Sequence, residues 1–174
     1  MATSPFELYV VISPIAAAFA GFGSLASGLG ERRGADDARV DSMRLALMLT
    51  TSLSATLLGL LPATLNALFL DDPFAVRASA IVALIVMLTY APISVRRASK
   101  LRQAPGFSKG GTLANAACSL MAFVAFLLCA VAAPSDRIDA LYLLGLVGLL
   151  GSSVIMFSRV IASMLRPHNE NGGA

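Results

Sequence analysis

The residues capable of acid–base, nucleophilic or metal chemistry are few in this chain and do not combine into a catalytic pattern. The single histidine, His168, lies in the polar C-terminal tail, far from Cys118 and Cys129. One tail histidine does not supply the axial ligands of a haem held between helices. No carboxylate pair shares an apolar segment, and no nucleophile stands beside a base. We therefore expect no enzyme activity, no metal site and no cofactor.

The two cysteines, Cys118 and Cys129, lie eleven residues apart in one apolar segment. On a helix this separation is about 16 Å along the axis, which prevents a disulfide between them. Because no histidine is near either thiol, we interpret both as small buried apolar residues rather than metal ligands.

Glycines near the N-terminus resemble a dinucleotide-binding fingerprint only superficially. Gly21, Gly23 and Gly28 precede Asp41, but the spacing to the third glycine is wrong and the whole segment is apolar. Small residues recur there at alternating steps of four and three, on one helix face that lets another backbone approach closely. This face, predicted to pack against a helix, contains Ala16, Ala20, Gly23, Ser27 and Gly30.

A second ridge of small residues follows near the C-terminus at steps of three. Its members are Gly145, Gly148 and Gly151. We predict helix packing there too, either within one subunit or between subunits.

These residues belong to a chain of 174 residues that is 57% hydrophobic and 13% charged, with a mean hydropathy of +0.78. A soluble domain carries about 25% charged residues, so the composition indicates an integral membrane protein. The uncharged stretches are 8–30, 45–70, 78–95, 112–133 and 140–158. As helices they would be about 27 to 39 Å long, close to the roughly 30 Å of a hydrocarbon core.

No stretch alternates apolar and polar residues, which disfavours strands. The fold prediction is an all-α, polytopic helical bundle with five transmembrane helices, forming one domain over residues 1–165. A short polar tail follows over 166–174. Pro14, Pro62 and Pro92 are candidate kink sites. Tyr142 is expected in an aromatic belt near the outer interface, and Tyr90 near the inner one.

The distribution of basic residues predicts an orientation. Eleven of the 13 Lys and Arg residues fall in alternate connections or the tail, at 32, 33, 39, 44, 96, 97, 100, 102, 109, 159 and 166. Only Arg77 and Arg137 fall on the other side. The positive-inside rule then places the N-terminus outside and the C-terminus in the cytoplasm. No basic residue precedes the first stretch, which is also too long for a signal peptide core, so we expect it to be retained. The abundance of Arg and Ala suggests a bacterial source, and hence the inner membrane.

The connections that precede the second and fourth stretches differ in charge. Residues 31–44 hold four acids and four arginines, and Asp36 or Asp37 is expected to cap the next helix. Residues 95–111 hold no acid and five basic residues, Arg96, Arg97, Lys100, Arg102 and Lys109. Each is worth about 1 kcal/mol near an anionic leaflet, which predicts contact with lipid headgroups or an acidic partner. The alternative is that they only determine topology.

Charge this close to the membrane, with Phe107 as the one nearby aromatic residue, does not favour nucleic-acid binding. Within the stretches the polar groups are mostly hydroxyls such as Thr50 and Thr56, which usually bond to the preceding turn or to a neighbouring helix. A transporter coupled to protons or sodium ions through its own carboxylate is therefore not expected.

The function expected from the sequence is structural. The chain is expected to be an accessory subunit of a membrane complex or a homo-oligomer, with the lipid bilayer and other membrane proteins as partners. The alternative is a small uncoupled channel or carrier, built from hydroxyls and backbone groups at the proline kinks.

Overall fold

The computed structural model describes residues 11–18, 20–22, 35–68, 72–101, 109–132, 134 and 136–164. Its long helices are α2 (Ala35–Leu68), α3 (Asp72–Leu101), α4 (Lys109–Val131) and α5 (Ile138–Met164). A shorter apolar helix covers Val11–Phe22. The described residues include no strand, so the prediction of an all-α fold is confirmed.

Four of the helices are long and apolar enough to cross a membrane. Their candidate spans are Met48–Leu68, Pro73–Ile93, Gly110–Val131 and Ile138–Ala162. The chain is therefore an integral membrane protein by the length and composition of its helices. Within the first predicted stretch, 8–30, the structure describes the helix Val11–Phe22, and positions 8–10 and 23–30 lie outside the described residues.

The helices extend beyond the apolar stretches of the sequence. α2 begins at Ala35, so positions 35–44, which the sequence assigns to a connection, are helical. Asp36 and Asp37 lie inside the first turn of α2 and do not cap it from outside, although a carboxylate there still favours the helix dipole. Hydropathy marks only the part of a helix that crosses hydrocarbon, whereas its backbone hydrogen bonds continue into the interface. α3 likewise continues beyond its apolar stretch, through Arg96 to Leu101.

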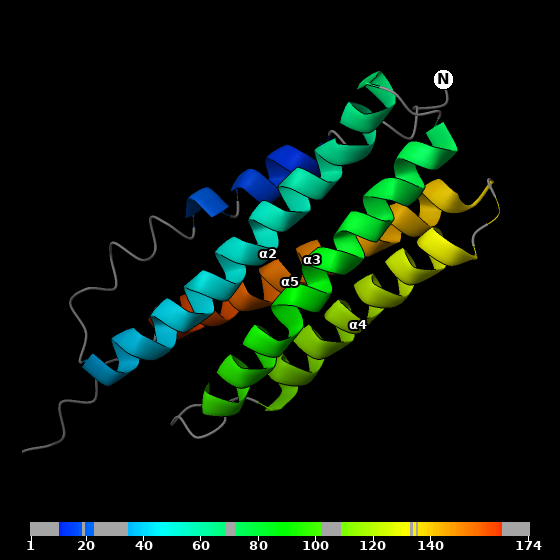
Figure 1. Ribbon diagram of the computed structural model, residues 1–174. Helices are drawn as coiled ribbons and strands as arrows, with labels where there is room; N and C mark the ends of the chain where they lie inside the picture. The colour runs from blue at the N-terminus through cyan, green and yellow to red at the C-terminus, as the bar shows by residue number, and fades with distance from the viewer. Residues whose placement is uncertain are drawn as a thin grey trace, which may run out of the picture.

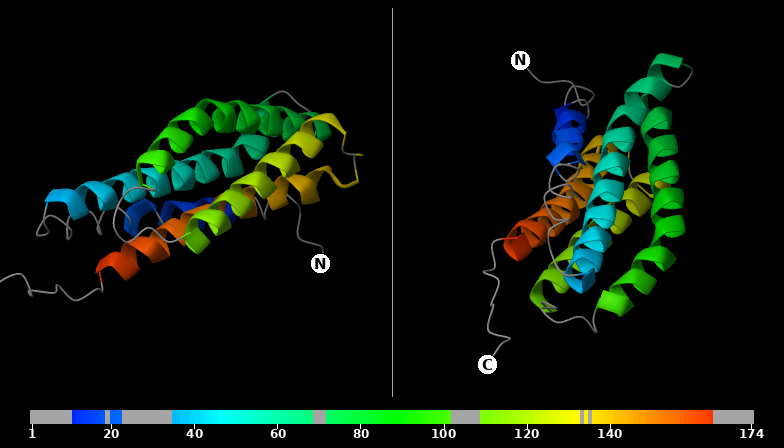
Figure 2. Two further views of the ribbon diagram at one scale, coloured as in Figure 1. Left: turned by 90° about the horizontal axis from the view of Figure 1, so that it is seen from below. Right: turned by 90° about the vertical axis from the view of Figure 1, so that its left-hand side faces the viewer.

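Successive long helices run antiparallel, and α5 lies behind α2 and α3 in the view of Figure 1. α5 contacts α2, α3 and α4, and its candidate span is 44% buried, the largest share of the four. The short helix Val11–Phe22 runs beside α2 and α5, on the side away from α3 (Figure 2). Of the four candidate spans, that of α5 is therefore the most enclosed by other helices.

The core between these helices is built mainly from small side chains. Fully buried alanines come from the short helix and from α2, α3 and α4, namely Ala16, Ala55, Ala80, Ala83 and Ala122. A few large residues fill the remaining space, chiefly Phe126, Tyr142 and Leu146. Small residues let helix backbones approach closely in a membrane, where lipid removes the hydrophobic drive for association.

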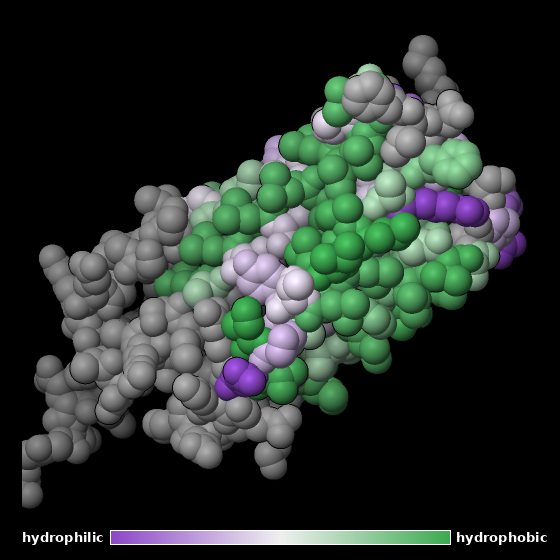
Figure 3. Space-filling model, viewed as in Figure 1, coloured by the Kyte–Doolittle hydropathy of each residue, from purple (hydrophilic) through white to green (hydrophobic). Residues whose placement is uncertain are grey.

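The face of the bundle drawn in Figure 3 is largely apolar. Large aliphatic side chains such as Leu57, Ile85, Leu120 and Val147 are exposed on α2, α3, α4 and α5 respectively. In water such a surface would be an aggregation liability, but in a bilayer it is the surface that lipid chains cover.

Candidate functional site

The most informative polar site lies in the membrane interior, where a proline interrupts α2. Pro62 is inside this helix and its side chain is fully buried. Because proline has no N–H, the carbonyl four residues earlier, at Leu58, loses its helical donor. Water is absent from the hydrocarbon region, so this carbonyl needs a donor from a neighbouring helix.

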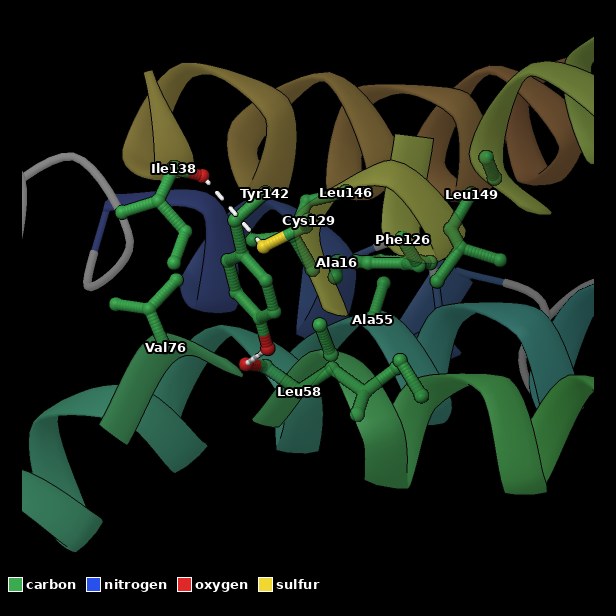
Figure 4. Packing of buried hydrophobic residues seen from close by; sticks show 13 residues of the cluster. Ala16, Ala55, Leu58, Val76, Phe126, Cys129, Ile138, Tyr142, Leu146 and Leu149 are labelled. Carbon is green, nitrogen blue, oxygen red and sulfur yellow. Dashed lines mark hydrogen bonds between the residues drawn. The ribbon is translucent and has the colours of Figure 1, made fainter. Parts of the chain in front are cut away.

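Tyr142 of α5 supplies that donor. Its hydroxyl donates to the Leu58 carbonyl oxygen at 2.6 Å, and the tyrosine side chain is fully buried. Figure 4 shows the ring reaching from α5 to the backbone of α2. The expectation that Tyr142 belongs to an aromatic belt is therefore wrong, because its hydroxyl bonds to protein and its ring is enclosed by the core.

The same tyrosine also contacts the other two long helices. Its ring packs edge-on against Phe126 of α4, with centroids 5.4 Å apart and planes at 63°, a favourable aromatic geometry. The Ser79 side chain of α3 lies within hydrogen-bonding reach of the phenol, while the Ser79 hydroxyl also donates to Ala75 of its own helix at 2.8 Å. One α5 residue thus links α2, α3 and α4.

Other interior hydroxyls join helices in pairs. Thr51 of α2 bonds to Ser153 of α5 at 2.8 Å. Ser152 of α5 donates to the side-chain oxygen of Asn115 on α4 at 2.5 Å. The Ser13 hydroxyl of the short helix donates to the Thr56 carbonyl at 3.1 Å. Each such bond between membrane helices contributes about 0.6 kcal/mol on average.

These interior bonds hold the helices in position relative to one another. The bonded groups are hydroxyls, an amide and backbone carbonyls, which do not titrate near neutral pH. Among the described residues, no group of three or more His, Cys, Asp or Glu side chains is placed to hold a metal ion. The site therefore consists of groups that fix the helices relative to one another.

A cluster of Cys129, Arg77 and Asp139 lies where α4 turns into α5. This end of the bundle is opposite the end where α3 reaches the basic residues of 95–111. The Cys129 thiol donates to the Ile138 carbonyl at 3.6 Å, and Arg77 and Asp139 are close enough to act on this sulfur electrostatically. Cys118 is half-buried, and both cysteines are free. The turn itself is closed by the Arg137 amide, which donates to Pro134 at 3.1 Å.

The glycine ridge of α5 lies against α4 of the same chain. A Cβ at Gly145 would be 2.6 Å from the Phe126 ring, and one at Gly148 would be 2.9 Å from the Cys118 carbonyl oxygen. A Cβ at Gly151 would be 3.2 Å from the Cys118 sulfur. The first two positions have no room for a side chain without movement of α4.

The N-terminal ridge is described only in part. Ala16 is fully buried and belongs to the main core, and Ala20 is half-buried. Gly23, Ser27 and Gly30 lie outside the described residues, so their packing remains a prediction.

Of the five basic residues predicted to contact headgroups or an acidic partner, the structure describes one side chain. Arg96 is exposed on α3. The backbone at Arg97, Lys100 and Lys109 is helical, whereas their side chains and the whole of Arg102 lie outside the described parts. Contact with lipid or a partner therefore remains a prediction for all five.

A groove of about 700 Å³ lies between α2 and α3 and was not anticipated from the sequence. Its walls are mostly leucine and valine, with the hydroxyl-bearing residues Thr50, Ser54, Thr64 and Tyr90 among them. In Figure 3 a pale, weakly polar band crosses the otherwise apolar face over these helices. The groove residues of α2 recur at the spacing of one helix face, which the sequence alone shows. The groove itself forms only because α3 lies beside that face.

Comparison with protein families, with curated proteins and with solved structures found no match to this chain.

The tyrosine–carbonyl bond predicts a specific energetic coupling. Tyr142→Phe should destabilise the bundle by about 1–3 kcal/mol, because the Leu58 carbonyl is left without a donor. In a Pro62→Ala background the cost should fall, since the new amide at position 62 can donate to that carbonyl. Unfolding of the four proteins in detergent measures this double-mutant cycle. Equal costs of Tyr142→Phe in both backgrounds would contradict the assignment.

The glycine face predicts a contrast between two substitutions. Gly148→Ala should cost about 1–3 kcal/mol of stability, because its methyl group meets the backbone of α4. Gly110→Ala is the matched control, since a Cβ there meets nothing within 4 Å. The control should be neutral or stabilising by up to about 1 kcal/mol. Thermal unfolding in detergent provides the comparison, and an unchanged midpoint for Gly148→Ala would count against close packing there.

Proposed function

We propose that this chain is a structural or accessory subunit of a membrane complex, which assembles with other membrane helices and neither catalyses a reaction nor moves a coupled ion. The observation that carries the proposal is the use of the interior polar groups. Tyr142, Thr51 and Ser152 each bond to a neighbouring helix. Polar groups engaged in this way support a rigid bundle and are not displayed along a solute path.

The outer face of α4 is the surface that best fits a partner helix. Gly110, Ala114 and Ala117 are exposed there at steps of four and three, the spacing that lets a second backbone approach. The α4 span is 22% buried, the smallest share of the four. The α5 glycines already face α4 inside the chain, so we assign assembly to this outward small-residue face of α4.

The ends of the bundle differ in charge, which supports the orientation that we propose. Arg39, Arg44, Arg96 and Arg159 belong to the end where α2 starts and α3 and α5 finish. Arg77 and Arg137 belong to the other end. The positive-inside rule places the richer end in the cytoplasm, with the N-terminus outside, in a membrane such as the bacterial inner membrane.

Isolation of the complex tests this function. A C-terminally tagged chain, extracted from its native membrane in mild detergent, should co-purify with stoichiometric membrane-protein partners. Ala117→Phe should remove them, because the ring blocks helix approach on α4. Ala67→Phe, at another exposed alanine, should not. Native mass measurement and protein identification provide the readout.

Two results would overturn the proposal. A chain recovered alone, with the same particle mass for wild type and Ala117→Phe, would remove the assembly role. Flux of a solute through proteoliposomes of the purified chain would favour a small uncoupled channel or carrier, and the hydroxyls of the α2–α3 groove would then be the first residues to substitute.

A further inference from the structure

The groove between α2 and α3 covers about two thirds of the hydrocarbon core. It extends along α2 from Thr50 to Thr64, a separation of fourteen residues and hence about 21 Å on a helix. This length exceeds the roughly 15 Å of one leaflet and is shorter than the roughly 30 Å of the whole core. The polarity and charge of its two ends therefore decide which molecule fits it.

The walls of the groove change character along its length. Thr50 and Ser54 of α2 and Tyr90 of α3 lie toward one end, whereas Leu57, Leu61 and Val82 line the deeper part. Thr50 and Thr64, one toward each end, donate to Ala46 at 2.8 Å and to Leu60 at 2.9 Å of their own helix. The end at Thr50 also has Ser54 and Tyr90, so it is the more polar end and suits the ester groups of an amphiphile, with the acyl chain among the leucines.

Charge at the polar end selects the kind of headgroup. α3 continues from Tyr90 to Leu101, and Arg96, six residues beyond Tyr90, is exposed. Positions 97 and 100 on the same helix are also basic, and residues 95–101 contain no acid. Basic residues at this level of a membrane attract anionic lipid headgroups. In Figure 1, α2 and α3 diverge toward this end, where a headgroup would enter.

We propose that the α2–α3 groove binds one anionic phospholipid, with an acyl chain along Leu57 and Val82 and its phosphate beside the basic end of α3. This inference is independent of the proposed assembly function. It names a lipid site on α2 and α3, whereas the assembly surface is on α4.

The absence of tryptophan from the chain allows a direct test. Tyr90→Trp introduces one fluorescent reporter into the groove, and Leu127→Trp introduces one on the exposed face of α4. Both proteins are reconstituted in phosphatidylcholine bilayers that contain either brominated phosphatidylglycerol or brominated phosphatidylcholine at the same mole fraction. Bromine quenches only a nearby reporter.

The reporter at position 90 should be quenched several times more strongly by the anionic lipid, whereas the α4 reporter should respond equally to both. Adding Arg96→Gln, Arg97→Gln and Lys100→Gln should reduce the preference, by about fivefold for each lost charge. Adding Ser54→Phe, which fills the groove, should remove the preference with the basic residues still present. Circular dichroism confirms that each variant remains helical.

Equal quenching by both lipids at position 90 would overturn the proposal. So would a preference that survives Ser54→Phe, because the lipid would then bind outside the groove. Shielding of position 90 from both lipids would indicate that a protein segment occupies the groove. Native mass spectrometry of the unsubstituted chain, titrated with phosphatidylglycerol or phosphatidylcholine, provides the second measurement and should show selective retention of phosphatidylglycerol.

Discussion

The bundle depends on a carbonyl that its own helix cannot satisfy. Pro62 removes the amide that would bond to Leu58, deep in a region from which water is absent. The Tyr142 hydroxyl replaces that amide, so α5 must lie at a fixed height and rotation beside α2. Phe126 then packs against the tyrosine ring, and Gly145 leaves the space that the Phe126 ring occupies. One backbone defect in α2 is thus compensated through α5 and α4.

Small residues and hydroxyls make this compensation possible along the rest of the bundle. In lipid, apolar side chains gain little by associating with one another, so close backbone contact and interhelical hydrogen bonds must hold the helices together. The contact of Gly148 with the Cys118 backbone is an example of close approach. The bond from Ser152 to Asn115 is an example of an interhelical hydrogen bond. Such groups are engaged within the monomer, and the faces that we propose for contact with other molecules are the outer side of α4 and the α2–α3 groove.

The class of fold could be predicted from the sequence because a long run of hydrophobic residues is a strong signal of a membrane-spanning helix. The sequence also singled out Gly145, Gly148 and Gly151 by their spacing, but whether they face another helix of the same chain depends on how α4 and α5 pack. Tyr142 was misinterpreted because an aromatic residue near a helix end usually lies at the interface. The signal that could have corrected this was Pro62, whose missing amide requires a donor from elsewhere. The groove could not be predicted, because it exists only between two helices whose relative placement the sequence does not state.

The bond between Tyr142 and Leu58 can be observed directly at the Leu58 carbonyl in a bilayer. Solid-state NMR with carbon-13 at that carbonyl and at the Tyr142 ring measures whether the two groups are in contact and whether the carbonyl accepts a hydrogen bond. We expect a cross-peak between them and a carbonyl chemical shift typical of a strong hydrogen bond, and this shift should change when Tyr142 is replaced by Phe. A Leu58 resonance that is unchanged by this replacement would contradict the bond between Tyr142 and Leu58.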